Sequence, residues 1–124
     1  LFPYTTLFRS PIKVATWNIE GLYELTKYEQ IMEYMIRNHV SIVALQETKA
    51  TQTHSFIKKG FEFFFSGDSG SKHHGVGFVV APQTRHLVVN FLGYNGRCCS
   101  IDLNIAPKPL QLICAYAPSM VAIR

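Results

Sequence analysis

The sequence predicts an α/β fold, also describable as α+β, in which mixed sheets pack as a sandwich, and two observations lead to this class. Residues 12–46 read as strand, helix and strand, which is a βαβ unit that is expected to be parallel and right-handed. Several short strand-like segments then follow with turn signals between them, which indicates antiparallel pairing. A βαβ unit that leads into antiparallel strands is typical of a mixed α/β sandwich.

The βαβ unit is inferred from hydrophobic periodicity. Residues 12–17 are β-rich, and residues 40–46 form a nearly continuous apolar run, as expected of a strand that is covered on both faces. Residues 24–39 between them carry apolar side chains at helical spacing. The expected apolar stripe consists of Tyr28, Ile31, Met32, Met35 and Ile36.

The rest of the chain is expected to be mostly strand. The expected strands are residues 61–66, 75–81, 85–92, 97–105 and 110–116. The Asn95–Gly96 pair is a strong hairpin signal, and the Pro-Lys-Pro sequence at 107–109 marks a second turn. The Lys58–Lys59 pair is interpreted as the solvated end of a helix.

Composition limits the class of protein. Of the 124 residues, 48% are apolar and 16% are charged, which excludes a disordered tail, a collagen-like repeat and a coiled coil. No apolar run approaches the roughly 18 residues that a membrane span needs. Three cysteines cannot pair evenly, which favours a reducing, intracellular location. The net charge of +4 suits a polyanionic partner, although many unrelated small proteins are equally basic.

The two ends of the chain differ from the part between them. Residues 1–10 resemble the translation of a sequencing adapter, so the expected domain spans residues 11–124; the alternative is a native amphipathic arm. Residues 119–124 directly follow a strand that reads as buried, so we expect the domain to be truncated. Half a sandwich is expected to leave one sheet face uncovered and to expose apolar side chains.

Polar side chains follow both strands of the βαβ unit. Asn18 and Glu20 follow the first strand, and Glu47 and Lys49 follow the second. Because the carboxyl ends of parallel strands lie at one edge of a sheet, these four side chains are expected to converge. Oxygen ligands beside a lysine suit a hard divalent cation that bridges to a phosphate. The alternative is a polar rim where the strands reach the surface.

Four short motifs suggest a family. They are Trp17-Asn18-Ile19-Glu20-Gly21-Leu22, Leu45-Gln46-Glu47-Thr48-Lys49, Gly75-Val76-Gly77 and Tyr116-Ala117-Pro118. In this order they resemble the endonuclease/exonuclease/phosphatase superfamily, in particular its abasic-site endonuclease branch, which includes the endonuclease domains of non-LTR retrotransposons. The resemblance covers residues 12–119 and implies the N-terminal half of the α/β sandwich of this superfamily.

The resemblance implies a metal site for Mg²⁺, with Mn²⁺ as a possible substitute. Glu47 matches the principal metal-ligating glutamate of the family. Asn18 matches an asparagine beside the metal and the phosphate, and Glu20 stands where relatives carry a second acidic residue. By the same resemblance, Asn18, Glu47 and Tyr116 are the expected catalytic residues, and the metal stabilises the leaving 3′ oxygen.

The resemblance also implies contacts with the DNA phosphate backbone. Lys49 matches a lysine near the scissile phosphate, and Tyr116 matches a tyrosine that hydrogen-bonds it. Ser119 stands where relatives often place a polar phosphate contact. His73 and His74 are either a metal-binding pair, a loop tip that faces DNA as in relatives, or part of a solvated loop, and His74 is the expected DNA contact. Arg97 follows the Asn-Gly turn and is either a phosphate contact or an exposed arginine at a strand end.

The sequence also departs from the family pattern. It lacks the Gly-Asp-Phe-Asn-type segment and the terminal Ser-Asp-His of the family's second half. Its two aspartates, Asp68 and Asp102, stand in other contexts, and no histidine follows His86. We therefore expect the isolated chain to be inactive, because roughly half of the catalytic set is missing.

These observations predict a function for the parent protein. It is expected to be a Mg²⁺-dependent endonuclease that nicks DNA, encoded by a retrotransposon and linked to a reverse transcriptase domain. Its expected location is intracellular, without a membrane partner, and nuclear if the element is eukaryotic. One alternative is a non-catalytic remnant that binds nucleic acid weakly at most. The other is part of a phosphatase or lipid phosphodiesterase of the same superfamily.

Overall fold

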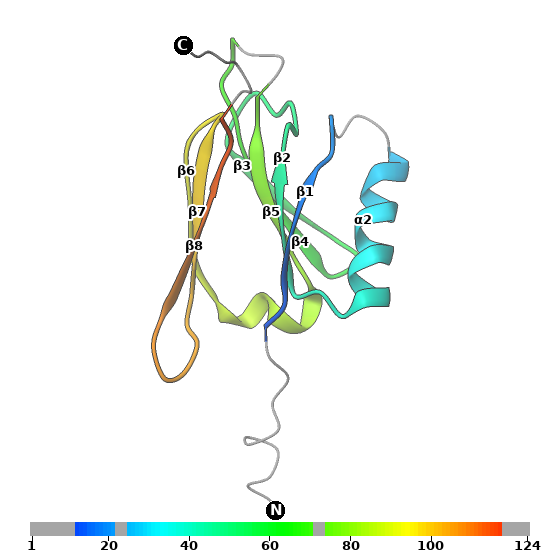
Figure 1. Cartoon of the computed structure of the whole chain (residues 1–124), viewed down its shortest axis with the longest axis vertical. Coiled ribbons are helices and arrows are strands. Elements are labelled where there is room, and N and C mark those ends of the chain that lie inside the picture. The colour runs from blue at the N-terminus through cyan, green and yellow to red at the C-terminus, as the bar shows by residue number, and fades with distance from the viewer. Residues whose placement is uncertain (1–11, 22–24, 71–73, 118–124) are drawn as a thin grey trace, which may run out of the picture.

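The computed structural model describes residues 12–21, 25–70 and 74–117, and it shows two facing sheets with a helix on the outer side of the larger one (Figure 1). The elements in chain order are β1 (Val14–Asn18), α2 (Leu25–Asn38), β2 (Ile42–Gln46), β3 (His54–Lys58), β4 (Phe61–Ser66), β5 (Val76–Val80), the 3₁₀ helix η1 (Pro82–Leu87), β6 (Val88–Asn95), β7 (Cys98–Leu103) and β8 (Leu110–Ala115). The predicted α/β sandwich is confirmed.

The larger sheet has five strands in the order β1-β2-β5-β4-β3. β1 and β2 are parallel, with Val14 opposite Ile42 and Asn18 opposite Gln46, and the other pairs are antiparallel. The parallel βαβ unit predicted from the sequence is therefore present. Since β1 and β2 run in the same direction, the chain leaves both strands at one end of the sandwich.

The helix α2 covers the outer face of this sheet because one of its sides is apolar. Ile31, Met32 and Met35 are at most 3% exposed, and the ring of Tyr28 packs edge-on against Phe63 at 5.2 Å. Ile36, predicted to belong to the same stripe, is 66% exposed. It therefore lies outside the buried side of the helix.

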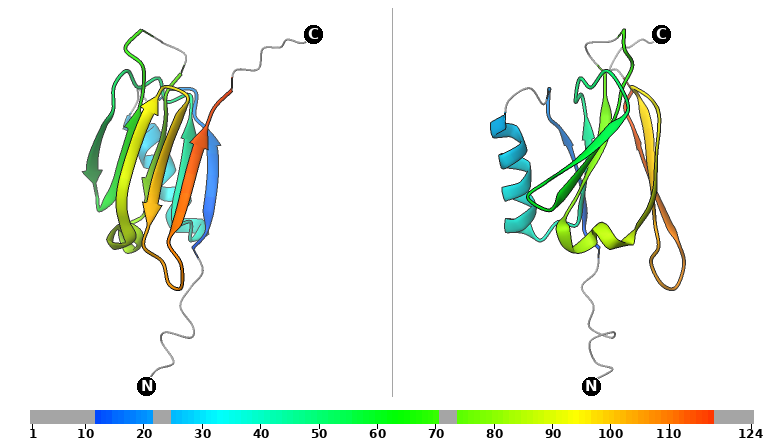
Figure 2. Two further views of the ribbon diagram at one scale, coloured as in Figure 1. Left: turned by 90° about the vertical axis from the view of Figure 1, so that its left-hand side faces the viewer. Right: turned by 180° about the vertical axis from the view of Figure 1, so that it is seen from behind.

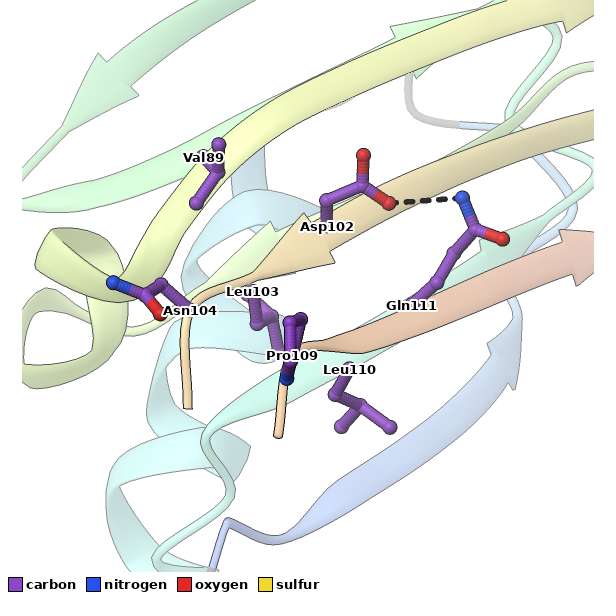
Figure 3. Close-up of a pocket in the computed structure, with 7 residues that line it drawn as sticks. All are labelled: Val89, Asp102, Leu103, Asn104, Pro109, Leu110 and Gln111. Atoms are coloured by element: carbon purple, nitrogen blue, oxygen red, sulfur yellow. Dashed lines mark hydrogen bonds between the residues drawn. The ribbon is translucent and has the colours of Figure 1, made fainter. Parts of the chain in front are cut away.

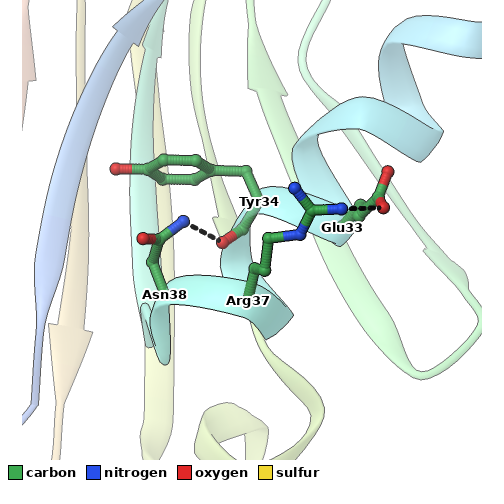
Figure 4. A network of polar contacts seen from close by, with 4 residues as sticks. All are labelled: Glu33, Tyr34, Arg37 and Asn38. Atoms are coloured by element: carbon green, nitrogen blue, oxygen red, sulfur yellow. Dashed lines mark hydrogen bonds and ion pairs between the residues drawn. The ribbon is translucent and has the colours of Figure 1, made fainter.

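The exposed side of α2 carries local polar contacts (Figure 4). Arg37 and Glu33 form an ion pair of 2.8 Å one turn apart, and the Asn38 side-chain amide donates to the carbonyl of Tyr34 at 3.0 Å. Such exposed pairs contribute only about 0.3–0.5 kcal/mol to helix stability. The helix is therefore held mainly by its buried side. No helix among the described residues is long and apolar enough to span a membrane.

The second sheet is an antiparallel β6-β7-β8 meander that packs on the larger sheet from the side opposite α2 (Figure 2). Side chains from both sheets form the core between them, with Phe78, Cys99 and Ile101 fully buried. The ring of Phe91 stacks on Phe64 at 4.9 Å. This packing sets the distance between the ends of β2 and β8, which belong to different sheets.

The predicted turns between these strands are confirmed. The backbone N–H of Arg97 donates to Oδ1 of Asn95 at 2.7 Å, which closes the hairpin between β6 and β7 at Asn95 and Gly96. The Pro-Lys-Pro sequence at 107–109 lies in the connection between β7 and β8.

Two local predictions are wrong. The Lys58–Lys59 pair does not end a helix, because Lys58 is the last residue of β3, and Lys59 (φ 52°) and Gly60 (φ 86°) form the turn into β4. β3 is an edge strand with a polar and largely exposed sequence, so it lacks the apolar alternation that reveals a strand. Residues 85–87, predicted as strand, lie in η1, which begins at Pro82.

The outer face of the second sheet exposes apolar side chains. Leu92, Ser100 and Ile113 are cross-strand neighbours there, and Leu92 and Ile113 are 42% and 64% exposed. Ser100 between them is 2% exposed, and its hydroxyl has no hydrogen-bond partner in the described part of the chain.

This arrangement predicts that Ser100→Ala raises the free energy of unfolding by about 1 kcal/mol, because an unpaired hydroxyl is costly to bury. Ser66→Ala is the matched control. Ser66 is also buried, but its hydroxyl donates to the carbonyl of Asn95 at 2.7 Å, so its loss should cost about 1 kcal/mol. Urea denaturation measures both changes. Equal destabilisation by the two substitutions would contradict the prediction.

Candidate active site

The ends of β1 and β2 bring the first two predicted residues together. Asn18 is the last residue of β1, and Glu47 directly follows β2. The side-chain amide of Asn18 donates to Oε2 of Glu47 at 3.1 Å. This bond uses the side-chain nitrogen Nδ2 of Asn18, so the side-chain oxygen of Asn18 is not part of it. An amide oxygen next to a carboxylate is a suitable metal ligand.

Tyr116 reaches the same carboxylate from the second sheet. Its hydroxyl donates to Oε2 of Glu47 at 2.8 Å, and its backbone N–H donates to the carbonyl of Arg97 at 2.8 Å, which extends the pairing of β7 with β8. One carboxylate oxygen thus accepts hydrogen bonds from residues of both sheets. The hydrogen bond to Glu47 raises the pKa of the Tyr116 hydroxyl above its ordinary value, while Arg97 acts in the opposite direction.

The loops after β1 and β2 hold their residues in uncommon backbone conformations. Glu20, Glu47 and Lys49 have φ values of 53°, 56° and 63°, a region that favours glycine. Such a conformation costs on the order of 1–3 kcal/mol per residue, and it tends to occur at functional sites. Backbone bonds between the loops offset part of the cost, since the N–H of Gly21 donates to the carbonyl of Glu47 at 2.7 Å.

A second set of backbone contacts packs three loops onto one another. The N–H of Lys49 donates to the carbonyl of His74 at 2.7 Å, and the N–H of Gly75 donates to the carbonyl of Gly96 at 2.8 Å. A Cβ on Gly75 (φ 111°) would lie 2.7 Å from the amide nitrogen of Lys49 and even closer to Oγ1 of Thr48. Only glycine allows the loops to approach this closely.

The loops at this end of the sandwich carry the predicted substrate contacts Lys49, His74 and Arg97. The His74 and Tyr116 rings have centroids 6.2 Å apart, and Arg97 is the residue whose carbonyl binds the backbone of Tyr116. Lys49 lies on the loop after β2, and Glu20 lies on the loop after β1. Ser119 lies outside the described residues. The functional roles of all these residues stay predictions.

Sequence reasoning missed the side-chain contacts that lie beneath the site. Gln46 exchanges hydrogen bonds with the hydroxyl of Thr16, at 2.8 and 3.1 Å, and its amide lies 3.5 Å from Sγ of Cys114. The Cys114 thiol in turn contacts the carbonyl of Leu45 at 3.4 Å. Gln46 thereby connects β1, β2 and β8 directly below Glu47. No sequence signal indicates this, because these contacts exist only after the sheets have packed.

The donor atoms at the site fit a hard divalent cation. Glu47 offers a carboxylate and Asn18 an amide oxygen, and Mg²⁺ is commonly bound by one or two carboxylates, with water and phosphate completing its shell. Zinc sites instead gather three or four protein ligands. In the described part of the chain, no three His, Cys, Asp or Glu side chains gather in a group that could hold a metal. The oxygen donors of Glu47 and Asn18 are thus of the kind that a hard divalent cation binds.

Comparison with protein families agrees with this geometry. Residues 15–113 match the sequence profile of the Endonuclease/Exonuclease/phosphatase family. The chain belongs to this family. The match includes Asn18, Glu47 and Arg97 and ends before Tyr116, whose placement at the site rests on its contact with Glu47. No curated protein matches the chain.

Membership of the endonuclease/exonuclease/phosphatase family gives the chain a general activity class. It identifies a domain of the nuclease and phosphatase type, in which the reaction is hydrolysis. The superfamily expected from the four motifs is thereby confirmed. The branch, the substrate and the choice of metal are separate questions.

The hydrogen bond between Tyr116 and Glu47 predicts a pH dependence. Because the pKa of Tyr116 is raised, the bond is fully present below about pH 10, the ordinary value for tyrosine, and is lost as the pH rises through the raised value. Glu47→Gln should lower the pKa of Tyr116 toward the ordinary value. NMR titration of ¹³C-labelled tyrosine measures it, and an unchanged pKa in the variant would contradict the contact.

The loop packing predicts that Gly75→Ala destabilises the chain by more than about 1 kcal/mol, because the new Cβ meets backbone and the φ value is unfavourable. Gly70→Ala is the control, since a Cβ there has nothing within 4 Å. Thermal unfolding of both variants tests this. If the two variants melt alike, the loops are not packed as described.

Proposed function

We propose that this chain provides the metal-binding side of a Mg²⁺-dependent endonuclease that hydrolyses DNA phosphodiester bonds. The observation that carries the proposal is the shared carboxylate of Glu47, whose Oε2 accepts hydrogen bonds from Asn18 and Tyr116. Family membership supports hydrolysis, and members of the family generally use divalent metals. The DNA substrate and Mg²⁺ go beyond family membership and are part of the proposal.

Glu47 and Asn18 are the residues that would hold the metal, with Glu20 as a further ligand through water. A divalent ion bound there would neutralise the charge that builds up on the phosphate and the leaving oxygen. Mn²⁺ accepts the same oxygen ligands and should substitute. Asn18 and Tyr116 fix the orientation of the Glu47 carboxylate, so its position does not depend on the metal alone.

Tyr116 and the neighbouring cations are proposed to bind the scissile phosphate. The Tyr116 hydroxyl has one hydrogen to donate, which is bound to Glu47 here and would turn to the phosphate when substrate binds. Lys49 and Arg97 lie on neighbouring loops and would supply positive charge to the DNA backbone, and His74 would offer a ring N–H as a hydrogen-bond donor. Phosphate contacts of this kind position nucleic acid without reading its sequence.

Two features favour DNA over the phosphatase and lipid alternatives. The sequence is basic, with 12 lysines and arginines against 8 acidic residues, which suits a polyanion. Lys49 also follows Gln46-Glu47-Thr48 directly, as in the endonuclease-like relatives that the motifs resemble. On the same resemblance, we propose a non-LTR retrotransposon origin, with a reverse transcriptase domain in the parent protein and action in the nucleus.

We also propose that the 124-residue chain has little or no turnover by itself. Asp102, one of its two aspartates, lies near the opposite end of the second sheet and is therefore not part of the site. There it accepts a hydrogen bond of 2.9 Å from Gln111 (Figure 3). Asp68 lies beside Gly96, where a Cβ on that glycine would be 2.8 Å from its Oδ2. Within residues 12–21, 25–70 and 74–117, no hydrogen bond or ion pair joins either aspartate to a histidine, as the family's second half would require.

The experiment is a Mg²⁺ titration of the chain with a short DNA duplex present, followed by NMR and calorimetry. Glu47→Gln should weaken Mg²⁺ binding by ~10-fold or more, since it removes the charged ligand. Glu33→Gln is the control, because Glu33 is exposed on α2 and pairs with Arg37. Equal Mg²⁺ affinity in wild type and Glu47→Gln would overturn the proposal, as would Mg²⁺ binding that perturbs resonances only at residues far from Glu47.

A further inference from the structure

Lys27 makes contacts that neither the motifs nor the proposed chemistry explain. It lies in the first turns of α2, and its ammonium group donates to the carbonyl of Ile19 at 2.7 Å and to that of Glu20 at 3.4 Å. Its stem helps to line a small cavity of about 50 Å³ together with Trp17, Ile19, Gln30 and Ile31. The side chain is thus directed back from the helix onto the end of β1.

The position of Lys27 on the helix is otherwise unfavourable. The start of a helix carries partial positive charge, so a cation there is repelled by the unpaired N–H groups. The first turn of α2 contains no acidic residue among the described positions to offset this. The hydrogen bonds to the two carbonyls offset this repulsion. They indicate that the ammonium group of Lys27 serves to bind the backbone of the loop after β1.

The segment that Lys27 contacts contains Glu20, one of the residues in a strained conformation. Ile19 and Gly21 donate their N–H groups to the carbonyls of Gln46 and Glu47, at 3.1 and 2.7 Å, and Glu20 lies between them with a φ of 53°. The N–H side of the segment is therefore held by the loop after β2. Its carbonyl side is held by Lys27.

We propose that Lys27 is a positioning residue that keeps Glu20 in its left-handed conformation and so fixes the β1 side of the metal site relative to Glu47. The part that concerns metal rests on the proposed function; the part that concerns the conformation of Glu20 does not. Lys27 acts through the backbone of residues 19 and 20 and is not a ligand.

Three variants test this. Lys27→Met keeps the apolar stem and removes the donor, whereas Lys27→Arg restores a charged donor. Lys13→Met is the matched control, because Lys13 makes the same kind of contact at the other end of β1 and α2, with its ammonium 3.0 Å from the carbonyl of Asn38. Both methionine variants change the net charge by the same amount.

Two readouts separate the inference from the proposed function. The first is the φ angle of Glu20 from its NMR coupling constant and Cα shift, measured without metal. The second is the concentration of Mn²⁺ that broadens the amide signals of Glu20, Gly21 and Glu47 by half. Lys27→Met should lose the left-handed signature and need ~10-fold more Mn²⁺, as expected when a residue that orients metal ligands is removed. Lys27→Arg and Lys13→Met should stay close to wild type.

Different results overturn different statements. If Lys27→Met keeps both the Glu20 signature and the Mn²⁺ response, Lys27 does not position the site. If wild type shows no Mn²⁺ broadening near Glu47, the proposed metal function fails, and the Glu20 coupling alone decides the role of Lys27. If Lys27→Met does not fold, Lys27→Gln takes its place. The inference is then overturned if this variant keeps both the Glu20 conformation and the Mn²⁺ response of wild type.

Discussion

The structure depends most on a single acceptor atom, Oε2 of Glu47, which binds Asn18 from the first sheet and Tyr116 from the second. The first contact requires β1 and β2 to be parallel, because only then do both strands end at the same edge. The second requires the sheets to pack at the right distance, which the buried layer around Phe78 and Ile101 sets. The sandwich core and the site are therefore coupled.

The site also shows how local strain is supported by close backbone packing. Glu20, Glu47 and Lys49 occupy conformations that cost energy, and each lies in a segment tied to a neighbouring loop by a backbone hydrogen bond. Gly75 makes this possible, since any side chain there would collide with the loop after β2. A rigid set of loops can hold a carboxylate in place before a metal arrives, which reduces the reorganisation that binding requires.

The sequence predicts the sheet edge well and the contacts across the sandwich poorly. Strand ends can be predicted because apolar periodicity marks β1, α2 and β2, and parallel strands necessarily end together. The contact of Tyr116 with Glu47 joins residues 69 positions apart, so its expected role came only from family resemblance. β3 was not predicted because it is a polar edge strand. The hydrogen bond from Lys27 to the backbone after β1 was not predicted either, because no sequence pattern indicates it.

The central claim is that Glu47 and Asn18 form the protein side of a divalent metal site at the end of the parallel strands. Anomalous diffraction from crystals of the chain soaked in Mn²⁺ tests it most directly, because it locates the metal without relying on activity. The account predicts one dominant Mn²⁺ peak in contact with the Glu47 carboxylate and the Asn18 amide oxygen. Full occupancy at other carboxylates, with no Mn²⁺ at Glu47, would contradict it.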